Sequence, residues 1–174
     1  MYDGIIHFIE ELKRCEAGNA KMAAALMVFV GIDTMAFLGL PAGQNAQGKD
    51  HFIEWADKYM KAHPDQIYTY TGIDLHAARC AALHCFTAEA DFHLRFPGAM
   101  RYVFSDGGKH YSSVDSRLVI IGLPSLINDF VLAVEAFLGD IEADAALRER
   151  VEARLPKIYV KRPFPDTARA TQPV

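Results

Sequence analysis

Apolar residues recur at helical spacing along most of the chain. In the first fifteen residues, positions 5, 6, 8, 9 and 12 are apolar and charged residues stand between them, a pattern typical of a helix with one buried face. Gly18-Asn19, Pro64 and other turn-forming residues separate this segment from similar ones. The pattern predicts helices at approximately residues 5–15, 22–40, 51–63, 71–90, 124–139 and 147–155.

The helical pattern is interrupted between residues 96 and 121. Tyr102 and Phe104 occupy alternate positions, Asp106-Gly107-Gly108 follows, and residues 119–121 are β-branched. We expect a small β-like hairpin or a long polar loop near residues 100–121. The predicted fold class is therefore all-α, a bundle of five to six helices that carries this one insertion.

The length of 174 residues fits one domain with a sizeable core. The composition, 51% hydrophobic and 23% charged, is globular and too apolar for a disordered chain. We expect a single helical domain over residues 1–160. Residues 161–174 contain three prolines and few apolar side chains, so this C-terminal tail is predicted to be extended or disordered.

Charge and cysteine content limit the functional classes. A net charge of −4 argues against a surface that attracts nucleic acid as a whole, so any phosphate site must be local. The three cysteines are an odd number without regular spacing, and the first residues lack the features of a secretory signal. These features predict a cytoplasmic protein.

The apolar segment from Met22 to Ala42 is long enough to suggest a membrane span. Its apolar side chains favour insertion by about 2–5 kcal/mol, while Asp33 near the centre costs about 2.5–3.5 kcal/mol. Because the two nearly cancel, we expect a buried core helix and no membrane association.

The predicted fourth helix contains the residues with the clearest chemistry. Arg79 and His84 stand five positions apart among small apolar residues. An imidazole with a pKa of about 6.5 can transfer the protons of RNA cleavage, and a guanidinium can bind the developing charge on the phosphate. On a helix of about 3.6 residues per turn the two are about 140° apart, so they are expected to flank a groove. A homodimer would close that groove.

The sequence Arg79-Cys80-Ala81-Ala82-Leu83-His84 resembles the motif of the HEPN superfamily, small helical proteins that dimerise. Ribonuclease members of that family carry Arg, four to six residues, then His. The resemblance implies a metal-independent endoribonuclease, or a relative that binds RNA or nucleotide, with Arg79 and His84 as catalytic residues at a dimer groove. In active members a polar residue tends to follow the Arg, whereas here the position is Cys80.

A metal site is a second interpretation of the same helix. His76, Cys80 and His84 share one face at i, i+4 and i+8, and their side chains suit transition metals. They span about 12 Å along the axis, at about 1.5 Å per residue, so the three cannot bind one ion together. We therefore predict neither a metal site nor a cofactor.

A non-catalytic structural or interaction protein is the alternative function. Asp33 is the one acid within the most apolar helix, and its burial requires a charged partner, which Arg79 can supply. His84 would then be a core histidine. Asp33, His76 and Cys80 are accordingly retained as further site-lining candidates.

Two other polar groups are predicted to be unrelated to function. Residues 106–112, which include His110, are expected to form a solvated loop. Asn128 and Asp129 on the fifth helix are expected to face solvent or to cap a neighbouring group.

Overall fold

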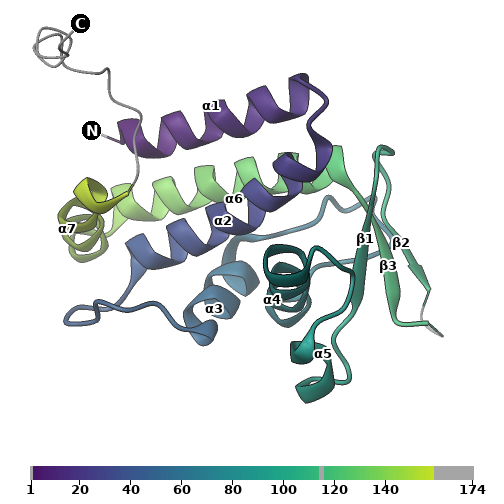
Figure 1. The fold of residues 1–174 in the computed structure, drawn as a ribbon. Helices are drawn as coiled ribbons and strands as arrows, with labels where there is room; N and C mark the ends of the chain where they lie inside the picture. The colour runs from purple at the N-terminus through teal and green to yellow at the C-terminus, as the bar shows by residue number, and fades with distance from the viewer. Residues whose placement is uncertain (1, 114–115, 159–174) are drawn as a thin grey trace, which may run out of the picture.

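The computed structural model describes residues 2–113 and 116–158 (Figure 1). The helical bundle surrounds a central helix, and a small sheet lies at one end of it. The predicted tail, 161–174, lies outside the described residues. In chain order the elements are α1 (Asp3–Ala17), α2 (Lys21–Gly39), α3 (Lys49–Tyr59), α4 (Gly72–Cys80), a π-helical turn (Ala81–Cys85), α5 (Asp91–Arg95), β1 (Arg101–Ser105), β2 (Tyr111–Ser113), β3 (Leu118–Gly122), α6 (Leu123–Ala143), α7 (Ala145–Arg154) and a 3-10 turn (Leu155–Lys157).

The all-α prediction is wrong, because residues 101–122 form a three-stranded mixed sheet in the order β1-β3-β2. β3 is central: it pairs in parallel with β1, Tyr102 opposite Val119, and antiparallel with β2. Tyr102, Val119 and Ile121 are buried and belong to the main hydrophobic core. The fold is therefore largely helical α+β, and the strands form part of the core rather than an insertion on its surface.

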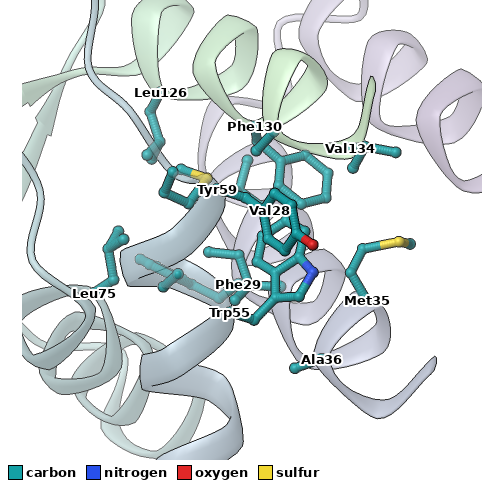
Figure 2. Close-up of a cluster of buried hydrophobic side chains, with 14 of the residues drawn as sticks. Val28, Phe29, Met35, Ala36, Trp55, Tyr59, Leu75, Leu126, Phe130 and Val134 are labelled. Carbon is teal, nitrogen blue, oxygen red and sulfur yellow. The ribbon is translucent and has the colours of Figure 1, made fainter. Parts of the chain in front are cut away.

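The core is centred on α2, which contacts α1, α3, α6 and α7. Figure 2 shows side chains from four helices meeting there; the labelled ones are Val28, Phe29, Met35 and Ala36 of α2, Trp55 and Tyr59 of α3, Leu75 of α4, and Leu126, Phe130 and Val134 of α6. A helix that is apolar around most of its circumference is stable when neighbours cover it on several sides. The inner face of α6 consists of buried apolar residues at helical spacing: Leu126, Phe130, Ala133, Val134 and Phe137.

Among the described residues α2 is the one helix long and apolar enough to cross a membrane, with a mean hydropathy of 1.9. Half of its apolar window is buried within the fold. Core helices of soluble proteins have the same composition, so this feature is weak evidence for a span. In this structure α2 is a core helix.

The fourth helix is shorter than predicted. Thr71 caps its start, and its hydroxyl oxygen accepts a hydrogen bond from the Asp74 backbone N–H at 3.1 Å. The α-helix changes to the π-helical turn after Cys80 and ends at Phe86, which has a left-handed φ of 52°. The short helix α5 follows, over residues for which the sequence pattern predicted no element.

Residues 106–109, Tyr111 and Asn128 are exposed as predicted, but His110 and Asp129 are buried, so the expectation of solvent exposure is wrong for these two side chains. The Gly122 backbone N–H donates to His110 Nδ1 at 3.0 Å, which places the ring proton on Nε2, 2.6 Å from the Tyr70 hydroxyl. Tyr70 in turn donates to Asp129 Oδ2 at 3.1 Å. Burial lowers the pKa of His110 and raises the pKa of Asp129. These bonds join α6 and the sheet to the segment before α4.

Arg154 fixes α7 to the end of α2. Its guanidinium is buried and donates to four backbone carbonyls, those of Leu38, Leu40, Pro41 and Gln44, at 2.7–3.2 Å. Carbonyls at a helix C-terminus lack partners within the helix and carry partial negative charge, so a buried cation is favourable there. The last described residues are thereby held near the C-terminal end of α2.

Two helical glycines provide a matched test of the core. A Cβ on Gly31 of α2 would meet the rings of Phe8 and Phe130, whereas one on Gly139 of α6 would meet nothing within 4 Å. We expect Gly31→Ala to lower the free energy of unfolding by about 1–3 kcal/mol through overpacking. Gly139→Ala should raise it by about 0.5–1 kcal/mol. Urea unfolding measures both, and a Gly31→Ala protein as stable as wild type would contradict this packing.

Candidate functional site

The π-helical turn brings Arg79 and His84 into contact. Arg79 Nη1 lies 3.2 Å from His84 Nε2, within hydrogen-bond distance. A π-helix closes its turn with i→i+5 hydrogen bonds, so residues five apart return to nearly the same face. The expectation that the two side chains diverge by about 140° assumed a regular α-helix. It is wrong because residues 81–85 are not α-helical.

Asp33 of α2 orients the guanidinium. Arg79 Nε donates to Asp33 Oδ2 at 3.0 Å, and Gln47 Nε2 donates to Asp33 Oδ1 at 3.0 Å. The contact that the structural alternative predicted is therefore present. The side chains of Arg79 and Asp33 are 25% and 26% exposed, so the pair is partly shielded from water but reachable from it.

His84 is exposed and is not the core histidine of that alternative. Arg79 Nη1 is its hydrogen-bond partner, and Arg79 Nη2 has no hydrogen bond to any residue that the structure describes. One guanidinium nitrogen and one imidazole face are thus open to solvent side by side. This arrangement can bind an oxyanion and transfer a proton to it.

His76 and Cys80 lie on the buried side of α4. The ring of His76 packs against Phe52 and Phe92, with centroid distances of 5.3 and 4.7 Å, and Nδ1 is 3.7 Å from Cys80 Sγ. Burial lowers the pKa of His76 to about 4, and the positive charges of Arg79 and Lys49 add to the shift. The ring is therefore neutral at pH 7.

The structure offers no clear metal site in the part of the chain that it describes. No group of three or more His, Cys, Asp or Glu side chains is placed to hold an ion. His76 is directed toward aromatic rings, while His84 contacts Arg79.

A groove of about 960 Å³ lies beside this cluster, and Asp33 and Gln47 form part of its wall. Its floor is half-exposed and apolar, formed by Phe8 of α1 and Leu26, Met27, Val30 and Phe37 of α2. Its size suits a ligand or a peptide. The sequence analysis missed this groove because helical periodicity marks apolar positions without showing which of them remain uncovered.

Comparison of the chain with models of known protein families, with curated proteins and with solved structures gives no match.

The Arg79–Asp33 pair can be tested by unfolding. We expect Arg79→Met to lower the free energy of unfolding by about 1–3 kcal/mol, because it leaves a half-buried carboxylate without its charged partner. In a double-mutant cycle with Asp33→Asn, the two changes should couple by at least about 0.5 kcal/mol. Arg14→Met removes a 61% exposed arginine from an ion pair and should cost less than about 1 kcal/mol. Additive effects at Arg79 and Asp33 would show that the contact contributes nothing.

His76 should make stability depend on pH. Its pKa is about 4 in the folded protein and about 6.5 when unfolded, so the unfolded state binds more protons between these values. Stability should fall as pH falls through this window, by on the order of 3 kcal/mol from this group. Urea unfolding at pH 7, 5.5 and 4 should show a weaker dependence in His76→Gln. Equal pH profiles would contradict the burial of a neutral ring.

Proposed function

We propose that the protein is a HEPN-like RNA-binding protein that acts as a metal-independent endoribonuclease at Arg79 and His84. The observation that carries the proposal is the direct contact between a half-exposed guanidinium and an exposed imidazole. These two groups suit the cleavage of a phosphodiester. The resemblance of the Arg79–His84 segment to the HEPN motif supports the same chemistry.

In this mechanism Arg79 binds the non-bridging oxygens of the phosphate through its open terminal nitrogen, while Asp33 holds Nε. The ribose 2′-hydroxyl attacks phosphorus, and the bond to the 5′-oxygen breaks. The products are a 2′,3′-cyclic phosphate and a 5′-hydroxyl. His84 donates a proton to the leaving 5′-oxygen, or accepts the one from the 2′-hydroxyl.

A single imidazole performs one of these two transfers at a time. A homodimer that places the site beside its two-fold axis would supply a second His84, and with it both an acid and a base. We therefore propose a homodimer as the active form. The exposure of His84 supports this arrangement because the imidazole is accessible to a second copy of the chain.

The second candidate function is a non-catalytic interaction protein. The observation that favours it is that both carboxylate oxygens of Asp33 are hydrogen-bonded, one to Arg79 and one to Gln47. A pair bonded in this way can have a purely structural role, in which Arg79 balances the charge of Asp33 and docks α4 on α2. In that case Arg79 would matter for stability and not for any ligand.

Cleavage of a mixed RNA pool in EDTA tests the proposal. We expect the wild-type protein to cleave RNA and to leave cyclic phosphate ends, and we expect His84→Ala to lose at least about 100-fold in rate because it removes the proton donor. His84 is exposed, so the variant should fold normally. His63→Ala is the matched control, since His63 is also exposed and its side chain bonds only within its own turn.

Three results would contradict the proposal. Cleavage that persists in His84→Ala would show that the site is elsewhere or that a contaminant is responsible. Loss of cleavage in EDTA with recovery on adding Mg²⁺ would indicate metal chemistry. Neither cleavage nor binding of RNA by the folded wild-type protein would favour the interaction protein.

A further inference from the structure

The groove between α1 and α2 begins where the described chain ends. Lys157 and Ile158 line it together with Phe37 and Gly4. The four carbonyls bound by Arg154 fix this part of the chain beside the C-terminal end of α2. The residues that follow Ile158 therefore start at the mouth of the groove.

We propose that residues 159–165 of the same chain bind in this groove as an extended segment. The sequence of this segment supplies apolar side chains for the floor, Tyr159, Val160 and Phe164, and two cations for the acids of the wall, Lys161 and Arg162. The groove is thus an intramolecular docking site for the C-terminal segment.

The lengths of the segment and the groove agree. The floor runs along α2 from Phe37 to Leu26, which is about 16 Å at about 1.5 Å per residue. Pro163 and Pro165 restrict their own φ angles and disfavour helix in the residues before them. At about 3.1 Å per residue, an extended chain from Ile158 to Phe164 covers about 19 Å. A segment of this length is long enough to bring Phe164 to the far end of the floor near Leu26.

The chemistry of the groove also matches the segment. Val30 is 40% exposed, and the neighbouring apolar positions of α2 are partly exposed, which leaves apolar surface that an aromatic side chain can cover. Glu11 and Asp33 stand on the wall. Residues 159–174 carry three basic side chains and one acid, a net charge of +2, while the whole chain carries −4, so −6 remains on residues 1–158. Attraction between opposite charges favours this occupant.

Docking would connect the segment to the Arg79 cluster through Asp33, which lines the groove and also binds Arg79. Lys161 or Arg162 near Asp33 would contribute a second cation to the same carboxylate. The docking itself does not depend on the proposed RNA chemistry, because its evidence is the groove and the chain that leaves it.

Isotope-filtered NMR on the full chain tests this proposal. A sample of labelled protein diluted with excess unlabelled protein should show NOEs within one molecule from the Phe164 ring to the methyl groups of Leu26 and Val30. Val30→Gln and Phe164→Ser should each abolish these NOEs. Leu132→Gln is the matched control, because Leu132 is 50% exposed on α6 and does not line the groove.

Two outcomes would overturn the proposal. NOEs that appear only between labelled and unlabelled molecules would mean that a second copy of the chain occupies the groove. Absence of any NOE from residues 159–165 to α1 or α2 would mean that this segment does not dock. RNA cleavage is measured on the same samples. Docking of residues 159–165 and RNA cleavage at Arg79 and His84 can each fail without the other, so the two measurements distinguish the two proposals.

Discussion

Asp33 places a carboxylate in the middle of the most apolar helix of the chain, and the arrangement around it follows from the need to match that charge. An acid removed from water without a partner costs several kcal/mol. Arg79 of α4 and Gln47 of the loop before α3 supply the hydrogen bonds. Two segments distant from Asp33 in sequence are thereby tied to one side chain of the core helix. The same contact holds the guanidinium near the surface, where Nη1 contacts His84 and Nη2 remains available.

Helices and the core could be predicted from the sequence to a useful degree. Helical periodicity located the main helices. The sheet was not predictable in the same way. Alternation identifies a strand, but the parallel pairing of β1 with β3 joins segments on either side of β2. His110 and Asp129 were misplaced because their partner, Tyr70, lies far from both along the chain.

The candidate site was predictable in its residues but not in its geometry. Arg79 and His84 stood out because they interrupt a run of small apolar residues, and the pairing of Arg79 with Asp33 followed from the charge on α2. Their direct contact did not follow, since Ala, Leu and Cys at positions 81–85 favour no π-helix over an α-helix. The groove was also missed, because exposure of Val30 and its neighbours depends on where α1 and α7 end.

The π-helical turn sets the distance between the Arg79 guanidinium and the His84 imidazole. A turn with i→i+5 bonds accommodates one residue more than an α-helical turn. If one of the alanines 81 and 82 were deleted, a regular α-helix could continue, and the imidazole, then four positions after Arg79, would stay within about 40° of it around the axis. The extra residue of the π-helical turn therefore lets an arginine and a histidine five positions apart meet as residues four apart do in an α-helix. The π-helical turn after α4 is therefore the structural element that positions Arg79 and His84 relative to each other.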